Sequence, residues 1–241
     1  MRGHVWSVLV VSFARGVSAE DDAASLRRIR ARALVIGLSV TPFGVSFGAV
    51  SVGSGLSVLQ TCLLSLVLFS GASQFALVSI LGAGGGVGSA LATTLLLGSR
   101  NGLYGAGVRG LLRAPAWLRP LAAQVTIDES TAMAFAEAPA GFAASAFWST
   151  AASVYVLWNL ATVLGALVGR GLGSLSVAGL DAAGPAAFVA LLGPRLRFAS
   201  ARVVALVAAA VAVLCVPLLP AGSPVLVGGG LAALAAVARR R

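Results

Sequence analysis

Residues 33–99 read ALVIGLSVTPFGVSFGAVSVGSGLSVLQTCLLSLVLFSGASQFALVSILGAGGGVGSALATTLLLGS, without a single ionisable acid or base. Residues 138–169 and 203–238 are two further tracts of this kind. A helix needs about 20 apolar residues to cross a bilayer core, so each tract has room for at least one crossing. Strands of a membrane barrel would alternate apolar and polar residues in segments of about 10 residues, and no such alternation occurs. These tracts indicate an α-helical membrane protein.

The composition of the whole chain agrees with this class. Of its 241 residues 59% are hydrophobic and 10% are charged, whereas soluble domains carry about 25% charged residues. The net charge of +10 comes from seventeen arginines, with no lysine. These arginines flank apolar tracts, as the cytoplasmic bias of cationic residues predicts, and do not form the basic face with interleaved aromatics of a nucleic-acid binder. We therefore expect a lipid bilayer, and no nucleic acid, as partner.

The chain offers little for metal or catalytic chemistry. Its only histidine, His4, lies near the N-terminus, which excludes a histidine-based site in the membrane. Cys62 and Cys215 lie within apolar tracts, where a small buried thiol is the simplest interpretation. We predict no metal, no cofactor and no enzymatic activity.

The apolar tracts divide into seven segments at glycine- and proline-rich turns. The segments are 33–53, 57–81, 87–109, 141–168, 172–193, 203–219 and 224–238. Residues 110–140 are more polar and predict a loop followed by an amphipathic or partly buried helix. The predicted fold is an all-α polytopic membrane protein, a bundle of about six to seven transmembrane helices with broken or re-entrant segments. We predict a cytoplasmic N-terminal arm at residues 1–32, preferred over a signal peptide because Arg15 interrupts the required apolar run, and a single transmembrane domain at 33–241.

Glycine occurs at spacings that allow close helix contact. Gly44-xxx-Gly48, Gly98-xxx-Gly102 and Gly165-xxx-Gly169 have small residues four apart, which favours helix packing. Glycine beside serine or proline also interrupts helices, and broken helices in transporters expose backbone groups to substrate near the midplane. We predict two such breaks, at residues 41–44 and at residues 70–74.

Four ionisable residues fall where the bilayer penalises charge. Arg100 lies inside the third apolar segment, which favours either a position facing the bundle interior or a helix end. Asp128 and Glu129 are adjacent, so on a helix they point about 100° apart, and we expect them not to serve one site together. Asp181 stands alone in an apolar segment and suits either proton binding or capping of a helix that starts near Pro185.

Four motifs together resemble the azaleucine-resistance (AzlC) family. They are Pro42-Phe43-Gly44-xx-Phe47-Gly48, Phe69-Ser70-Gly71-Ala72-Ser73-Gln74-Phe75, Arg100-xx-Leu103-Tyr104-Gly105 and Asp128-Glu129-Ser130. The resemblance covers about residues 33–200. It implies the large subunit of a bacterial plasma-membrane exporter of leucine, isoleucine, valine and, as a further candidate, methionine. It also implies a small membrane subunit of the AzlD type as partner. The third segment departs from the family's common Asn-x-Arg-His, since Gly98 and Asn101 replace its asparagine and histidine.

The site follows from what a zwitterionic amino acid requires. No nucleotide-binding loop occurs, so proton antiport is the economical driving force. The carboxylate needs helix-start N–H groups or an arginine, the ammonium needs a carboxylate or free carbonyls, and the side chain needs an apolar pocket. The predicted substrate-binding residues are Pro42, Phe43, Phe47, Ser70, Gly71, Ser73, Gln74, Phe75, Arg100 and Asn101. The predicted proton-coupling residues are Asp128, Glu129 and Asp181.

A second class of function stays open from the sequence alone. Small-residue packing motifs also serve a non-transporting membrane scaffold or assembly subunit. Topology gives a further expectation, because seven alternating crossings would place nine arginines on the wrong face. If segment 57–81 instead enters and leaves on one side, bent at Ser70-Gly71, fifteen of the seventeen arginines become cytoplasmic. We therefore expect a re-entrant segment and a cytoplasmic C-terminus, with a break at Pro42 as the alternative way to change the number of crossings.

Overall fold

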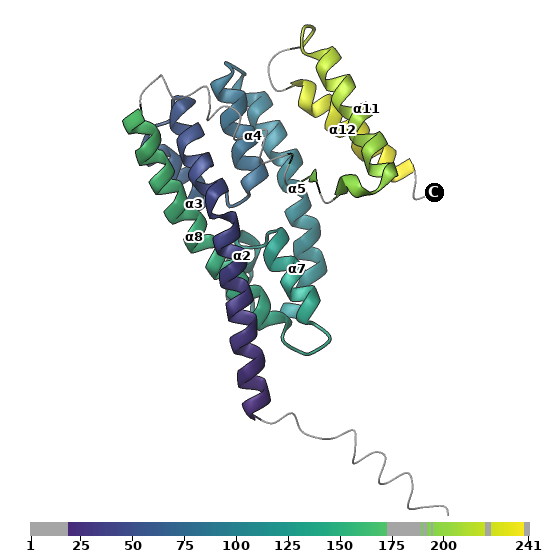
Figure 1. Ribbon diagram of the computed structural model, residues 1–241. Coiled ribbons are helices and arrows are strands. Elements are labelled where there is room, and N and C mark those ends of the chain that lie inside the picture. The colour runs from purple at the N-terminus through teal and green to yellow at the C-terminus, as the bar shows by residue number, and fades with distance from the viewer. Residues whose placement is uncertain (1–18, 173–188, 190–191, 194, 220–222, 239–241) are drawn as a thin grey trace, which may run out of the picture.

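The computed structural model describes residues 19–172, 189, 192–193, 195–219 and 223–238, and all regular secondary structure in them is helical (Figure 1). Two 3-10 turns, Ala116–Leu118 and Arg195–Arg197, join longer elements. The helices are α2 (Ala19–Gly53), α3 (Val58–Val67), α4 (Gly71–Gly82), α5 (Val87–Leu112), α6 (Arg119–Gln124), α7 (Asp128–Glu137), α8 (Ala143–Leu172), α11 (Ala199–Cys215) and α12 (Ser223–Ala238). The all-helical prediction is confirmed for this part of the chain.

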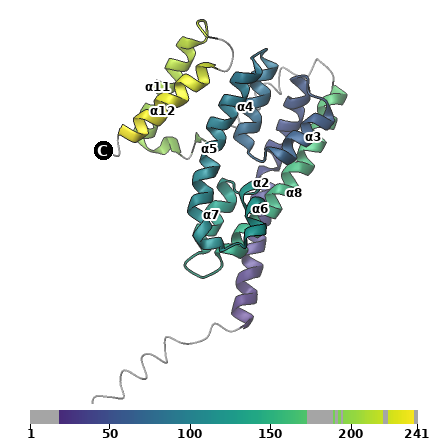
Figure 2. The same cartoon turned by 180° about the vertical axis from the view of Figure 1, so that it is seen from behind.

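Helices α2 and α8 form a long parallel pair along one side of the bundle (Figures 1 and 2). A Cβ on Gly44 would lie 2.9 Å from the Cβ of Ala161, and one on Gly169 would lie 2.9 Å from the Cα of Ala49. Because only glycine allows backbones this close, two of the three predicted glycine pairs are confirmed as packing motifs. The third pair, Gly98-xxx-Gly102, does not make such a close contact. A Cβ on Gly98 would lie 3.4 Å from the hydroxyl oxygen of Ser73, and a Cβ on Gly102 would have no neighbour within 4 Å.

Helices α3 and α4 form a hairpin that returns to the end of the bundle where it began. The chain bends at residues 68–70, and at the far end of α4 a Cβ on Gly82 would lie 2.8 Å from the Cβ of Ser54. With 10 and 12 residues, these helices are about 15–18 Å long, roughly half of a bilayer core. The bend predicted at Ser70-Gly71 is present, and it lies inside the bundle.

Helices α6 and α7 form a second hairpin that enters from the opposite end. Its chain bends at residues 125–127, and α7 ends where Glu137 pairs with Arg32 near the start of α2. Met133 of α7 lies in one core cluster with Ile29 and Ala146, close to the starts of α2 and α8. The sequence predicted one partly buried helix in this region and missed the bend that makes it a hairpin.

The predicted break at Pro42 is wrong, because α2 is continuous from Ala19 to Gly53. Proline removes the N–H that would bond the carbonyl of residue 38, but the flanking turns stay helical. The hydroxyls of Thr41 and Ser46 donate to the carbonyls of Gly37 and Pro42. The helix also runs through residue 32 without interruption, so the division between arm and membrane domain stays a prediction.

The outer surface of the bundle is apolar. Large hydrophobic side chains stand exposed along the helices, among them Leu95 (73% exposed), Leu103 (75%) and Leu206 (70%). Two described helical stretches, Glu20–Gly53 and Ala143–Gly171, are long and apolar enough to cross a membrane. Such a surface suits lipid rather than water. The predicted span 172–193 lies largely outside the described residues, so the structure does not give the number of crossings.

Helices α11 and α12 pair with each other beside the main bundle (Figure 1). A Cβ on Gly228 would lie 2.8 Å from the carbonyl oxygen of Ala208, and one on Gly229 would lie 3.3 Å from Leu96 of α5. The contact with α5 is therefore made by α12. Helices α2, α5 and α8 and the two hairpins, rather than this pair, enclose the site.

Candidate functional site

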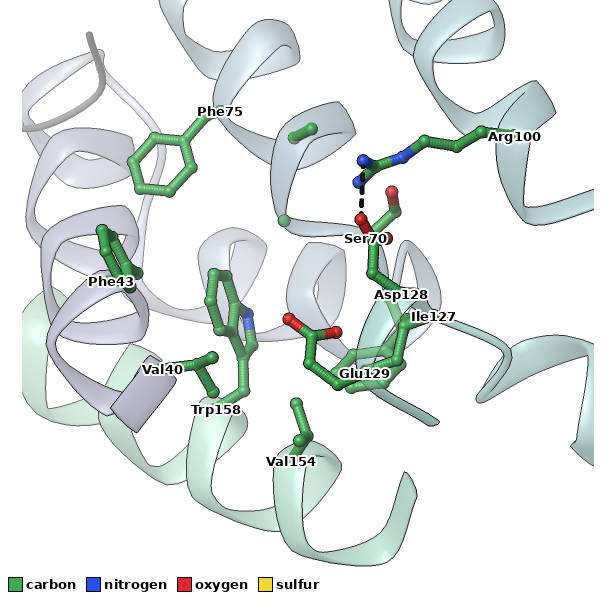
Figure 3. A pocket seen from close by; sticks show the side chains of 13 residues that line it. Val40, Phe43, Ser70, Phe75, Arg100, Ile127, Asp128, Glu129, Val154 and Trp158 are labelled. Atoms are coloured by element: carbon green, nitrogen blue, oxygen red, sulfur yellow. Dashed lines mark hydrogen bonds and ion pairs between the residues drawn. The ribbon is translucent and has the colours of Figure 1, made fainter. Parts of the chain in front are cut away.

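The bends of the two hairpins meet at a cavity inside the bundle. The volume of this central cavity is about 80 Å³, which is room for roughly five to eight water-sized groups. Its lining comes from α2, the first hairpin, α5, the second hairpin and α8. The lining residues are Val40, Phe43, Phe69, Ser70, Gly71, Ala72, Phe75, Arg100, Ile127, Asp128, Glu129, Val154 and Trp158. Figure 3 shows charged groups on one side of the cavity and aromatic groups on the other.

Helix α4 begins at the cavity with its first turn open. Ser70 is the N-cap residue with extended backbone, and its side chain makes no capping hydrogen bond. The first helical bond there runs from the N–H of Gln74 to the carbonyl of Ser70, while Gly71 and Ala72 line the cavity. The opening N–H groups of a helix have no intrahelical partner and carry about half a positive charge. The start of α4 is thus suited to hold an anionic group.

The bend that places this helix start is braced by buried side chains. Gln74, fully buried, donates through Nε2 to the carbonyls of Leu68 and Ser65. Gln124 of the opposite hairpin donates to the carbonyls of Leu66 and Val67, at 2.9 and 2.8 Å. Helix ends within a membrane need such partners because no water is present to supply them. The two hairpins therefore hold each other at their tips.

Arg100 and Asp128 form an ion pair in the cavity wall (Figure 3). The Nη1 atom of Arg100 lies 3.0 Å from Oδ2 of Asp128, and the side chains are 35% and 39% exposed. The Nε atom of Arg100 is buried and has no hydrogen-bond partner. This arginine faces the bundle interior, one of the two positions expected from the sequence, and it keeps a donor free for a further acceptor.

Glu129 projects toward Trp158 in the same cavity (Figure 3). The expectation that Asp128 and Glu129 would not serve one site is wrong, since both line this cavity. The cavity covers the first turn of α7 rather than one side of the helix, so residues that point 100° apart both reach it. Two carboxylates at a helix start are also stabilised by the positive end of the helix dipole.

Aromatic rings form the opposite wall. Phe43 and Phe75 face the cavity with Trp158, and Val40 and Val154 lie below them in Figure 3. The indole N–H of Trp158 donates to Oε1 of Gln74 at 3.0 Å. That bond fixes the ring, because the same amide braces the hairpin bend. This wall offers an apolar surface of the kind that an aliphatic side chain needs.

A comparison with models of known protein families shows to which family the chain belongs. A family model described as AzlC protein matches residues 35–172, from α2 to the end of α8. The chain belongs to the AzlC family. The matched range contains every residue that lines the central cavity. No curated protein matches the chain, and no solved structure does. Membership makes this a membrane protein with a transport-related role, in a family associated with transporters and not with enzymes.

The central cavity brings together about half of the site residues predicted from the sequence. The predicted residues in its wall are Phe43, Ser70, Gly71, Phe75, Arg100, Asp128 and Glu129. Pro42, Phe47, Ser73, Gln74 and Asn101 do not line it. Phe47 packs behind the wall, 5.7 Å from the ring of Phe75, and Ser73 donates to the carbonyl of Thr94. Asp181 lies outside the described residues, and all these roles stay predictions.

Several residues that line the central cavity were not predicted from the sequence. Val40, Ile127 and Val154 carry no signal that separates them from other apolar residues, whereas Ala72 belongs to the predicted break at residues 70–74. Trp158 had one, because Tyr155-xx-Trp158-Asn159 is a polar-aromatic group within an otherwise aliphatic segment. Gln124, which braces the bend, lies in the polar stretch 110–140, but its position in the sequence does not indicate a partner in the first hairpin.

Proposed function

We propose that the chain is the large subunit of a secondary transporter that exports branched-chain amino acids from bacteria. The substrates are leucine, isoleucine and valine, with methionine as a further candidate, and a small AzlD-type membrane subunit is the partner. The central cavity carries the proposal, since one wall is charged and the other is aromatic. A small zwitterion with an aliphatic side chain matches both walls.

Each part of the substrate has a partner in this proposal. The carboxylate binds the open start of α4, assisted by the free Nε donor of Arg100. The ammonium binds the carboxylate of Glu129. The side chain lies against Phe43, Phe75 and Trp158. Asp128 keeps Arg100 in place through its ion pair.

Glu129 couples export to protons in this proposal. Its carboxylate binds either the substrate ammonium or a proton, because protonation removes the charge that attracts the ammonium. Mutually exclusive binding at one group is what antiport requires. A proton that enters on Glu129 is thus exchanged for an amino acid that leaves.

The test measures amino acid efflux from cells. A pulse of a leucine-containing dipeptide loads a deletion strain, and the chain is supplied with its small subunit. We expect lower internal leucine and resistance to toxic leucine analogues with the wild type. Glu129→Gln removes the proposed ammonium site and should abolish efflux, whereas Glu20→Gln, in the exposed first turn of α2, should not change it. Unchanged pools despite membrane expression of both subunits would favour the scaffold function instead.

Membrane sidedness is tested separately. We propose location in the bacterial plasma membrane with the N-terminus and the arginine-rich end of the bundle in the cytoplasm. Ala83 and Ala140 are exposed in the loops after α4 and α7, at opposite ends of the bundle. In a chain whose two native cysteines are replaced, Ala83→Cys should react with an impermeant thiol reagent in intact cells, and Ala140→Cys only after permeabilisation. A reporter after Arg241 should be cytoplasmic, and a periplasmic signal would contradict the re-entrant topology.

A further inference from the structure

A second cavity lies between α5, the connection after it and α6. Its volume is about 530 Å³, and it shares no lining residue with the central cavity. The lining residues are Gly105, Val108, Arg109, Leu112, Arg113, Ala114, Arg119, Ala122, Ala123 and Thr126. The function proposed above makes no use of it.

Three arginines and no acidic residue line this basic cavity. Within the described residues the ion pairs are those of Arg32 and Arg100, so Arg109, Arg113 and Arg119 have no acidic partner there. The Nε atom of Arg119 donates to the carbonyl of Ala114 at 3.3 Å, which leaves its other donors available. Three cations around one hollow favour an anion with several oxygen acceptors, such as a phosphate group.

The backbone at the mouth of the cavity supports a role for the cation at position 113. Arg113 ends α5 in the left-handed conformation, with φ of 44°. Glycine takes this conformation without a steric penalty, whereas arginine does so at some cost. In return, the side chain stands at the cavity beside Arg109 and Arg119.

Apart from Thr126, whose hydroxyl donates to the carbonyl of Ala122, the rest of the lining is apolar, and this decides which kind of anion fits the cavity. Val108, Leu112 and Ala122 form part of the wall, and a free inorganic anion gains nothing from them. Trp117, in the same connection, is 77% exposed. Exposed tryptophan is typical of the membrane–water interface, and basic pockets between helices at the cytoplasmic side suit anionic lipid head groups. The ligand should therefore carry a phosphate and an acyl chain.

We propose that the basic cavity binds the phosphate head group of an anionic phospholipid, with the start of its acyl chains along α5. The ligand bridges the end of α5 and the start of α6. It thereby fixes the base of the second hairpin, whose tip forms part of the central cavity.

The test uses the full-length protein, purified in detergent, and native mass spectrometry with phosphatidylglycerol or phosphatidylcholine. We expect wild type to keep one phosphatidylglycerol selectively. An arginine near a membrane surface contributes about a fivefold change in affinity for anionic lipid, so R109Q/R113Q/R119Q should weaken binding on the order of 100-fold. The control R27Q/R28Q/R202Q removes three exposed arginines elsewhere and should bind as wild type does. R109K/R113K/R119K keeps the charge and should retain most of the binding.

The outcomes separate the alternatives. Equal retention by the two glutamine variants, or no preference for phosphatidylglycerol in wild type, would overturn the proposal. Displacement of the lipid by millimolar inorganic phosphate would indicate a free-anion site and also overturn it. If R109Q/R113Q/R119Q aggregates, R109K/R113K/R119K provides the test. This variant keeps the three positive charges, so loss of its preference for phosphatidylglycerol over phosphatidylcholine would contradict a head-group site.

Discussion

Glycine at position 165 is predicted to set the distance between α2 and α8. A Cβ there would lie 2.7 Å from the carbonyl carbon and 2.9 Å from the Cα of Val45, against ordinary contacts of about 3.5–4.0 Å. Gly165→Ala therefore forces the two helices apart by roughly 1 Å. Overpacking of this kind costs about 1–3 kcal/mol, partly offset by about 0.5–1 kcal/mol from replacing a helical glycine. We expect a net loss of stability on the order of 1–2 kcal/mol.

The matched control lies in the same helix. A Cβ on Gly171 meets nothing within 4 Å, and this glycine is the second-last residue of α8, so Gly171→Ala should change the stability by no more than about 0.5 kcal/mol. The assay is thermal unfolding in detergent, followed by loss of the monodisperse peak. For a chain of this size, 1 kcal/mol corresponds to about 2–4 °C, so only Gly165→Ala should lower the midpoint clearly. Equal shifts, or a Gly165→Ala midpoint at or above that of wild type, would refute the role given to glycine packing.

Three further sets of substitutions test residues proposed to act in transport. Gln74→Leu leaves the indole N–H of Trp158 and the carbonyl of Leu68 without their buried partner, so it should cost about 2–4 kcal/mol and abolish efflux. The control Gln60→Leu loses only the exposed capping bond from the N–H of Ser57, so it should cost about 0.5–1 kcal/mol and leave efflux intact. R100Q and D128N should each lower the unfolding midpoint. The loss of stability in the double variant should be smaller than the sum of the two single losses by about 1–2 kcal/mol, a modest coupling because both side chains are partly exposed. Additive losses would show that the ion pair does not contribute to stability. Asp181→Ala should stop efflux at normal membrane levels if that residue binds protons, and full efflux would leave it a capping role.

The class of the protein and its first hairpin were predictable because their signals are strong and local. Long uncharged tracts have one physical interpretation, and Ser70-Gly71 brings two poor helix formers together in a span. The arginine distribution then favoured the return of this segment to its starting side. The spacings Gly44-xxx-Gly48 and Gly165-xxx-Gly169 predicted close helix packing, although spacing alone did not show that these two motifs face each other.

The second hairpin was not predictable from the same kind of signal. Residues 125–127 read Val-Thr-Ile, which contains neither glycine nor proline, and the bend depends on tertiary contacts. Ser130 accepts from the N–H of Ile127 and donates to the carbonyl of Val125, while Gln124 reaches the first hairpin. The break predicted at Pro42 is the opposite case, since α2 packs closely against α8 on both sides of the proline, at Gly37 and Gly44, and this packing tolerates one missing hydrogen bond.

The charges around the central cavity add a consequence to the proposed transport cycle. The starts of α4 and α7 contribute about half a positive charge each, and together with Arg100 they balance the carboxylates of Asp128 and Glu129. A cavity close to neutral holds a zwitterion without surplus charge, whereas a protonated Glu129 leaves about one positive charge. Exchange of a neutral amino acid for a proton is then electrogenic, and an interior-negative potential of 100 mV adds about 2.3 kcal/mol per charge to export. In proteoliposomes that hold both subunits, a potassium diffusion potential should accelerate leucine efflux at equal pH on both sides. Efflux that depends on the pH difference but not on the potential would contradict this charge balance.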